Sequence, residues 1–453
     1  MARIVIVGAG PAGMAAAVVL AAHAQRPIVL DEAARAGGQG YRLPGTTLAE
    51  AAWTPAGQKR QAARLHAAFA AVADRIDYRP ETLAWHIHEG AVHTLARGRA
   101  GAVGFDALIL ATGATERLYP LPGWTLPGVT TLGGAQTLLK DQGCLVGRHV
   151  VFCGSSPLLY LAAVQYARHG AEVVAVLDTT LLGRKLRALP TLAAAPSLLA
   201  RGASWIADLR RRGVALHGGV RLRRIAGAEG VRRLDWLDAA GGERSVGADA
   251  VAMGFGLSSE TQLAQLAGCA MRYDAVTRQF LPRTDSDGRA SAGLFVAGDG
   301  GAIGGAEAAE VSGRLAGLGV LAELGMAPPA AEVARLRARL SRLRRFQAGL
   351  QEAFTPPAGL AASLPDETTV CRCESVTAGR LRAVLRNYAG EANVNRVKAL
   401  SRCGMGRCQG RFCAPVLAEL VAAERGVGLE RAGWLRAQAP VKPLPLAVTE
   451  VQL

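Results

Sequence analysis

Five of the eight cysteines of this 453-residue chain lie in its last quarter, close enough in sequence to act together. They are Cys371, Cys373, Cys403, Cys408 and Cys413. The first predicted strand begins almost at Met1, so we expect no signal peptide and a cytoplasmic protein whose thiols stay reduced. Thiolates at such short spacings in a reducing compartment indicate a metal centre, either an iron–sulfur cluster or a zinc ion, in preference to a disulfide framework.

A second group of residues that could take part in chemistry lies at the other end of the chain. There a short apolar run leads into Gly8-Ala9-Gly10-Pro11-Ala12-Gly13. In this spacing the first glycine makes a tight turn, the second admits a pyrophosphate, and the third lets a helix pack on the preceding strand. The N-terminus of that helix offers N–H donors to the phosphates. Asp31 follows the next predicted strand, where an acid binds ribose hydroxyls, and Glu32 is the alternative. A nucleotide redox cofactor and a thiolate metal site in one chain together indicate electron transfer.

Two similar strand–turn–helix–strand units must position these residues, the first predicted over residues 3–30 and the second over residues 149–177. A Pro/Gly-rich segment at 120–128 separates them, and a returning strand and closing helix are predicted at 293–324. We therefore expect a second Rossmann-like domain inserted into the first. The predicted divisions are 1–120 with 268–325 for the first domain, 121–267 for the inserted domain, 326–369 for a helix and linker, 370–425 for the cysteine domain, and 426–453 for a tail.

The second turn departs from the nucleotide-binding pattern. Ser156 and Leu159 stand where the second and third glycines would be, and only Gly154 is kept. Asp178 ends the next strand and could still meet a ribose. The sequence therefore makes binding of NAD(P)H doubtful and favours a scaffold role for this domain.

The formal net charge of +16 comes almost entirely from arginines scattered along the chain. The densest run, from Arg335 to Arg345, alternates with Leu336, Leu340 and Leu343 at helical spacing. It predicts an amphipathic helix with a solvated basic face, the alternative being a docking surface for an acidic redox partner. No aromatic–basic interleaving accompanies the charge, so we expect no nucleic-acid partner. No apolar stretch is long enough to predict a transmembrane segment.

Several motifs resemble the two-dinucleotide-binding-domain flavoproteins, the glutathione-reductase-like family. Besides the N-terminal turn they are Gly37-Gly38-Gln39, Ala111-Thr112-Gly113 and Ala297-Gly298-Asp299. The resemblance implies an α/β fold in which the first domain binds FAD and Asp299 bonds its ribityl–pyrophosphate region. Arg42 and Glu307 are further candidates to line the flavin.

The disulfide reductases of that family carry a redox-active cysteine pair, and none is visible in this sequence. The isolated Cys144, Cys153 and Cys269 are predicted to be small buried hydrophobic residues. We expect no thiol–disulfide chemistry.

The cysteine-rich segments resemble the bacterioferritin-associated-ferredoxin-like [2Fe–2S] domain, a small and mostly helical unit. The resemblance is carried by residues 370–377, Val-Cys-Arg-Cys-Glu-Ser-Val-Thr, and 404–413, Gly-Met-Gly-Arg-Cys-Gln-Gly-Arg-Phe-Cys. It implies cluster ligation by Cys371, Cys373, Cys408 and Cys413. Cys403 is expected to be a bystander, although it could replace Cys408 as a ligand.

As a whole, residues 1–425 resemble the alpha-type FAD/[2Fe–2S] subunits of heteromeric amino-acid and opine dehydrogenases, the group with proline and hydroxyproline dehydrogenases, opine oxidases and hydrogen cyanide synthases. The resemblance implies a separate oxidase-like FAD beta subunit that oxidises the substrate, an optional small ferredoxin-like subunit, and a quinone, cytochrome or similar acceptor. The complex could hold the chain at the inner face of the membrane.

No acid–base pair identifies a catalytic residue in this sequence. Two other functions stay open: a self-sufficient NAD(P)H-dependent flavoprotein reductase, and a non-catalytic iron–sulfur module that senses redox state or binds a partner. Rapid consumption of NADH by the isolated chain would favour the first of these alternatives. Partner binding that changes when the cluster is lost would favour the second.

Overall fold

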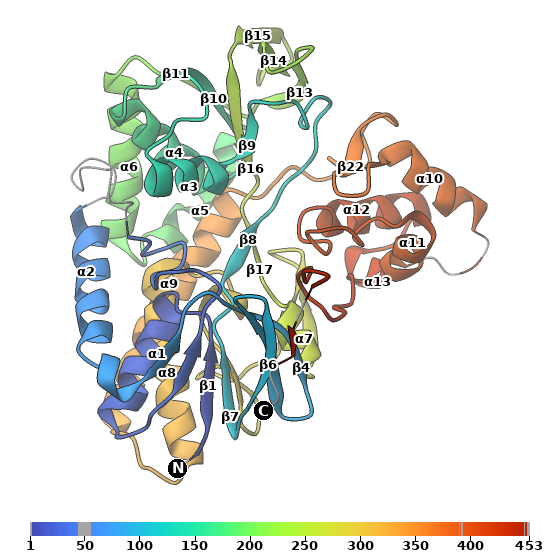
Figure 1. Ribbon diagram of the computed structural model, residues 1–453. Coiled ribbons are helices and arrows are strands. Elements are labelled where there is room, and N and C mark those ends of the chain that lie inside the picture. Colours follow the sequence, from blue (N-terminus) through green and yellow to red (C-terminus); the bar gives the residue numbers. More distant parts are fainter. Residues whose placement is uncertain (1, 44–55, 389, 391–392, 448, 451–453) are drawn as a thin grey trace.

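The structure is a computed structural model that describes residues 2–43, 56–388, 390, 393–447 and 449–450. Residues 448 and 451–453 of the predicted tail lie outside the described residues. Two α/β units, each built on a parallel sheet, lie one above the other, and a small helical unit with the C-terminal cysteines lies beside them (Figure 1).

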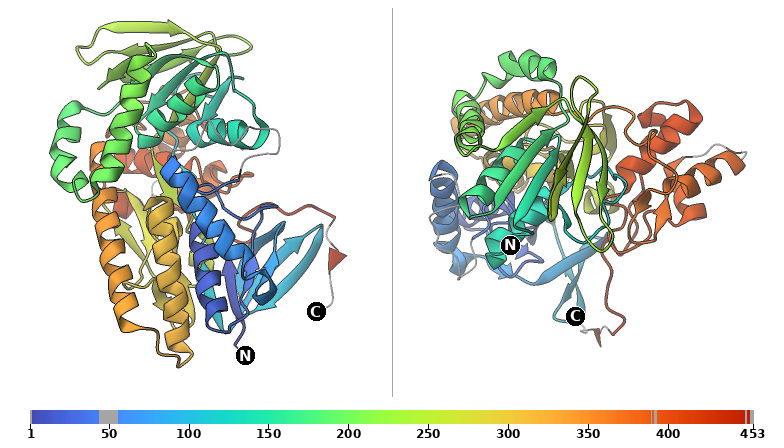
Figure 2. Two further views of the ribbon diagram at one scale, coloured as in Figure 1. Left: turned by 90° about the vertical axis from the view of Figure 1, so that its left-hand side faces the viewer. Right: turned by 90° about the horizontal axis from the view of Figure 1, so that it is seen from above.

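The first unit is built on a six-stranded sheet in the order β20-β21-β7-β1-β2-β3. Its central strand is the fully buried run Ile4–Val7, which pairs in parallel with β2 and β7. Helices α1 and α8 pack closely against each other, as Figure 2 also shows. The strands are β1 (Ile4–Val7), β2 (Ile28–Leu30), β3 (Asp77–Arg79), β7 (Ala107–Leu110), β20 (Arg289–Ser291) and β21 (Leu294–Val296), and the helices are α1 (Pro11–Ala22), α2 (Ala56–Ala70), η1 (Ala73–Arg75), η2 (Gly298–Gly300) and α8 (Gly305–Glu323).

Smaller sheets flank this unit. A meander of β4 (Thr82–His88), β5 (Ala91–Ala96) and β6 (Arg99–Gly104) is extended by β24 (Thr449–Glu450) from the tail. The short helix α7 (Gln262–Leu266) and the hairpin of β18 (Met271–Asp274) and β19 (Gln279–Pro282) follow the inserted unit.

The second unit has a five-stranded parallel sheet in the order β12-β11-β10-β16-β9. Two antiparallel linker strands, β8 (Ala114–Glu116) and β17 (Leu257–Ser259), join it to the first unit. The unit comprises β9 (Val129–Thr131), α3 (Leu132–Gln142), β10 (His149–Gly154), α4 (Pro157–Arg168), β11 (Glu172–Asp178), α5 (Leu182–Leu192), α6 (Pro196–Arg211), β12 (Ala215–Gly218), the antiparallel β13 (Arg221–Ala226), β14 (Arg233–Leu237) and β15 (Glu243–Gly247), and β16 (Ala250–Gly254).

Helix α9 (Ala330–Ala353) confirms the amphipathic helix predicted from the arginine-rich run. Leu336, Leu340 and Leu343 are buried in the core of the first unit. Farther along the helix, Phe346 and Ala353 pack on α5 of the second unit. One helix therefore clamps the two units together.

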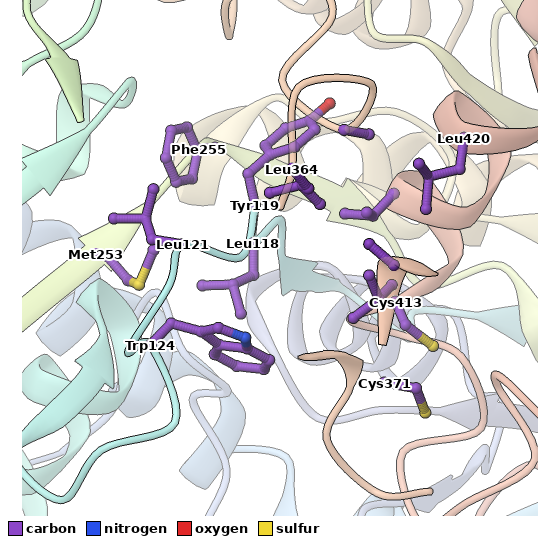
Figure 3. Packing of buried hydrophobic residues seen from close by; sticks show 14 of the residues in the cluster. Leu118, Tyr119, Leu121, Trp124, Met253, Phe255, Leu364, Cys371, Cys413 and Leu420 are labelled. Atoms are coloured by element: carbon purple, nitrogen blue, oxygen red, sulfur yellow. The ribbon is translucent and has the colours of Figure 1, made fainter. Parts of the chain in front are cut away.

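The cysteine unit consists of β22 (Thr369–Cys371), β23 (Val376–Thr377), α10 (Ala378–Asn387), α11 (Val394–Ser401), α12 (Ala414–Arg425) and α13 (Leu429–Ala432). It shares one hydrophobic core with the second unit, because Leu118, Tyr119 and Trp124 of the connecting segment reach across to Leu364 and Leu420 (Figure 3). The chain beyond α13 returns to the first unit, where the centroids of the Trp434 and Phe280 rings lie 4.1 Å apart with the rings tilted by 32°.

None of the described helices combines the length and the apolar composition that a membrane span requires.

Candidate functional site

The first glycine turn has the shape that its sequence predicts. Gly8 has φ of +102°, and a Cβ atom there would lie 2.4 Å from the carbonyl oxygen of Ala111. A Cβ on Gly13 would lie 1.8 Å from the carbonyl oxygen of Gly8, so only glycine lets α1 start so close to β1. A Cβ on Gly10 would meet nothing nearer than 3.9 Å, which leaves open the space that a phosphate requires. Pro11 and Ala12 form the first turn of α1, with backbone N–H groups free of helical partners after the proline.

The acidic residues after β2 hold different positions. The Asp31 carboxylate accepts hydrogen bonds from the backbone N–H groups of Ala9, inside the turn, and of Ala33. Burial raises the pKa of Asp31 above its ordinary value, against these two hydrogen bonds. Glu32 is exposed and pairs with Lys442 of the tail. Asp31 is therefore the acid beside the turn.

The segment Gly37-Gly38-Gln39 lies against the same turn. The Gly37 N–H donates to the carbonyl of Ala9 at 2.8 Å, and a Cβ on Gly38 would lie 2.9 Å from the Cα of Gly10. Gln39 is exposed at the end of this loop. Arg42, predicted to line the flavin, pairs with Asp141 of α3 and so ties this loop to the second unit.

The returning strand brings the remaining predicted residues to the same edge of the sheet. A Cβ on Gly298 would lie 2.9 Å from that of Ala12, which places the end of β21 against the start of α1. Asp299 is partly buried and accepts hydrogen bonds through one oxygen, Oδ1, from the N–H groups of Gly304 and Gly305. Burial raises the pKa of its carboxyl group. Glu307 lies in the first turn of α8 and accepts a hydrogen bond from Arg339 at 2.8 Å.

Thr112 and Gly113 connect this edge of the first sheet to Glu260, which follows β17. Thr112 Oγ1 donates to the carbonyl of Glu260 at 2.6 Å, and the Glu260 N–H donates to the carbonyl of Gly113 at 3.0 Å. Gly113 has φ of +72°, a conformation that favours glycine. The donor groups, the open space at Gly10 and the acid at position 31 together fit a dinucleotide.

The second turn is arranged differently. Asp178 is fully buried and already accepts hydrogen bonds from Tyr160, Thr180 and Lys185. The Lys185 ammonium lies 5.2 Å from the ring centroid of Phe354, just past the end of α9. The C-terminal part of α9 and the residues after it line the cavity above the turn. The acid that would meet a ribose is thus engaged within the protein.

The cysteine unit brings all five clustered cysteines together. The Sγ atoms of Cys371, Cys403 and Cys413 lie within 4.8 Å of one another, and all three residues are buried. Cys413 also makes a thiol hydrogen bond with Cys408, which in turn contacts Cys373. Hydrogen bonds with Cys403 and Cys413 lower the pKa of Cys371 to about 2, and the one with Cys413 lowers the pKa of Cys408 to about 5. The hydrogen bonds with Cys371 raise the pKa values of Cys403 and Cys413. Five cysteine side chains gathered in this way fit a zinc ion or an iron–sulfur cluster.

The position of Cys403 was not anticipated from the sequence. It was expected to be a bystander, yet it sits inside the buried trio with two of the four predicted ligands. Helix α11 ends at Ser401, and Arg402 with φ of +67° turns the chain back so that Cys403 faces Cys371. The choice of four ligands among the five cysteines therefore stays a proposal.

Among the isolated cysteines, the prediction of burial is confirmed for Cys153 and Cys269 and wrong for Cys144. Cys144 follows Gly143, the left-handed residue that ends α3, and the turn places its side chain at the surface.

One ion pair joins the cysteine loop to the first unit. Arg411, between Cys408 and Cys413, donates to the Glu260 carboxylate at 2.5 Å, and both side chains are nearly buried. Gln262 Nε2 donates to the backbone carbonyl of Gln409 at 2.8 Å. The backbone of Glu260 is also hydrogen-bonded to the Thr112 hydroxyl and to the Gly113 carbonyl. No sequence motif marks Glu260, since its role depends on a contact across 151 positions of the chain.

The fold and the turn geometry define a flavoprotein-type oxidoreductase with Rossmann-like units. Residues 2–313 match the pyridine nucleotide-disulphide oxidoreductase family. The chain belongs to this family.

Three known proteins are similar to this chain over 98% of its length. The chain is 40% identical to an opine oxidase subunit of Rhizobium meliloti, over 98% of this chain and 86% of that protein. It is 32% identical to hydrogen cyanide synthase subunit HcnB of Pseudomonas aeruginosa, over 98% and 97% of the two chains. The crystal structure of L-proline dehydrogenase from P. horikoshii has the same fold, with a TM-score of 0.72 and 19% identity over 98% of this chain and 78% of that one. The first two relatives are subunits of larger enzymes by name, and the predicted resemblance to this group is confirmed.

Proposed function

We propose that this chain is the electron-transfer subunit of a heteromeric dehydrogenase or oxidase acting on the CH–NH group of an amino acid, imino acid or opine. FAD would bind at the first glycine turn, and a [2Fe–2S] cluster would be held by Cys371, Cys373, Cys408 and Cys413. When bound, a flavin takes up electrons in pairs and a [2Fe–2S] cluster passes them singly. An oxidase-like FAD beta subunit would oxidise the substrate, and a small ferredoxin-like subunit would be an optional component. The electrons would leave to a quinone, cytochrome or similar acceptor.

The observation that carries this proposal is the double attachment of Glu260. Its backbone is bonded to Thr112 and Gly113 at the flavin edge, and its carboxylate is bonded to Arg411 in the cysteine loop. Such a connection would fix the separation between a flavin at the first turn and a cluster in the cysteine unit, which relay of electrons requires.

The engaged Asp178 argues against the alternative of a self-sufficient NAD(P)H reductase. Its carboxylate would have to give up Tyr160, Thr180 and Lys185 to meet a ribose. Taking the partner away from a buried charge costs about 3–5 kcal/mol. The alternative of a non-catalytic sensing module leaves a complete nucleotide-binding edge in the first unit unexplained.

The test is an anaerobic titration of the purified chain, followed at the flavin absorption band. We expect no bleaching with NADH or NADPH, and bleaching when a copurified oxidase-like flavoprotein and its amino-acid or opine substrate are added. Fast bleaching by NADH alone would overturn the relay function in favour of the reductase. Iron analysis and the electron paramagnetic resonance spectrum of the reduced chain test the cluster separately, since a zinc protein gives no signal.

A further inference from the structure

Three of the eight histidines lie together on the meander at the side of the first unit (Figure 1). His86 and His88 are two positions apart on β4, so their side chains lie on the same face of that strand. His93 on β5 is the residue directly opposite His86 across the strand pair. The pairing of the two strands therefore gathers three imidazole rings on one face of the sheet.

The spacing of the rings suits a shared metal ion. The ring centroids of His86 and His93 are 5.4 Å apart, and those of His86 and His88 are 5.5 Å apart. An imidazole nitrogen binds a zinc ion at about 2.1 Å, and two such ligands at a tetrahedral angle have ring centroids about 5 Å apart. The rings are stacked, with interplanar angles of 25° and 9°, so their nitrogens converge only when the rings turn about the Cβ–Cγ bonds. Such a turn leaves the ring centroids and the paired strands where they are.

The His86 ring is free of the hydrogen bond that usually fixes a half-buried imidazole. His66 and His169 are also half-buried, and each has a ring nitrogen 2.8 Å from a backbone carbonyl oxygen. In His86, by contrast, Nδ1 is buried and has no hydrogen-bond partner among the described residues. Turning this ring therefore breaks no hydrogen bond made by that atom, and it brings a nitrogen toward the neighbouring rings.

The protonation of the group also favours a cation. Burial lowers the pKa of His86, and the neighbouring His93 and His88 lower it further. Its imidazole is therefore neutral at neutral pH, which is the form that binds metals. The Glu89 carboxylate lies 3.4 Å from Nε2 of His88 and can accept its proton, which leaves Nδ1 of that exposed ring for an ion.

We propose that His86, His88 and His93 bind one divalent transition-metal ion of the kind that imidazole ligands favour, such as Ni²⁺, Zn²⁺ or Cu²⁺. His86 is the ligand at the centre of the site, because its ring is the neighbour of both others. Water completes the coordination, and the bound ion ties β4 to β5. The site belongs to the first unit, and it does not depend on the proposed relay of electrons.

The test is equilibrium dialysis of the full chain against nickel chloride at neutral pH, with the bound ions counted per chain. His86→Asn should bind one Ni²⁺ fewer than the unmodified chain, and ions held by the cysteines cancel in this difference. His88→Asn and His93→Asn should weaken binding of that ion at least about tenfold, the smallest cost of losing even an indirect contact to a metal ligand. His217 is a single exposed histidine whose ring centroid lies 5.7 Å from that of Trp236, so His217→Asn is the matched control and should bind as the unmodified chain does.

Trp85 reports where the ion binds. The centroid of its ring lies 5.4 Å from that of His93 and 5.8 Å from that of His86. Paramagnetic Ni²⁺ at this distance quenches tryptophan fluorescence, so the unmodified chain should lose fluorescence that His86→Asn keeps. Trp85→Phe should abolish this difference in quenching and retain the ion. Equal Ni²⁺ content in His86→Asn and the unmodified chain, an equal loss in His217→Asn, or a quenching difference that survives Trp85→Phe would overturn the assignment.

Discussion

The ion pair between Arg411 and Glu260 gives the sharpest prediction, because it joins the cysteine loop to the residue that is hydrogen-bonded to Thr112 and Gly113. Their side chains are 11% and 13% exposed. Removing one member of a buried pair costs about 3–5 kcal/mol, since the other charge is left desolvated and unpaired. In Arg411→Met the lost hydrogen bonds to the carbonyls of Cys408 and Val441 add to this cost. At 1.36 kcal/mol per tenfold, even about 3 kcal/mol favours local opening of the loop by about 150-fold.

Native-state hydrogen exchange of the full chain measures this opening directly. Amides of residues 403–413 and 258–262 should exchange about 100-fold faster or more in Arg411→Met, while those of β1 keep their protection. The double variant Glu260→Gln/Arg411→Met removes both charges, so it should recover at least about 1 kcal/mol of the loss. Arg407→Met is the matched control, because Arg407 lies exposed in the same loop. Unchanged exchange in Arg411→Met, or an equal change in Arg407→Met, would refute the reasoning.

Four further substitutions test the two cofactor regions. Gly13→Ala places a methyl group 1.8 Å from the Gly8 carbonyl oxygen and should leave no soluble folded chain, whereas Gly10→Val keeps the melting temperature of the cofactor-free protein and loses the flavin absorbance. Cys408→Ser should abolish the iron content and the paramagnetic signal of the reduced chain while flavin absorbance is retained. Asp299→Asn keeps the acceptor oxygen for both backbone donors and removes a buried carboxyl whose folded pKa is raised. The native protein without cofactor should therefore lose stability relative to this variant as the pH rises above about 4. Below the ordinary pKa of the carboxyl group, the two proteins should have equal melting temperatures. A difference in melting temperature that stays constant across pH would contradict this prediction.

The sequence predicted the first unit closely because its signals are local. Three consecutive elements make up this part of the chain: the buried strand at residues 4–7, the glycine turn and the helix at residues 11–22. The residue types in each of them are determined by contacts with residues nearby in the sequence. Asp31 was likewise found by its distance from the turn. That Arg42 and Glu307 line the flavin stays a prediction, and their ion-pair partners, Asp141 and Arg339, come from elements that no local pattern connects to them.

The difference between local sequence signals and long-range packing also explains what the cysteine spacing could and could not predict. Short spacings bring Cys371 near Cys373 and Cys408 near Cys413, but the position of Cys403 depends on how α11 ends. The left-handed turn at Arg402 and the packing of Gly404 and Gly410 around the Leu435 side chain set that position. Sequence pattern indicates that the thiolates gather, and only the packed helices decide which of them face one another.

The second unit has a structural role that is independent of its glycine turn. Strand β10 and its neighbours bury Val151, Leu177 and Met253 in the same core as Cys371 and Cys413 of the cysteine unit. Trp124 reinforces that contact by donating from its indole nitrogen to the carbonyl of Thr369 at 2.7 Å, two residues before the first clustered cysteine. Deleting the unit would therefore expose the core on which the cysteine cluster is folded. The unit supports the position of that cluster through packing, and packing does not require a bound nucleotide.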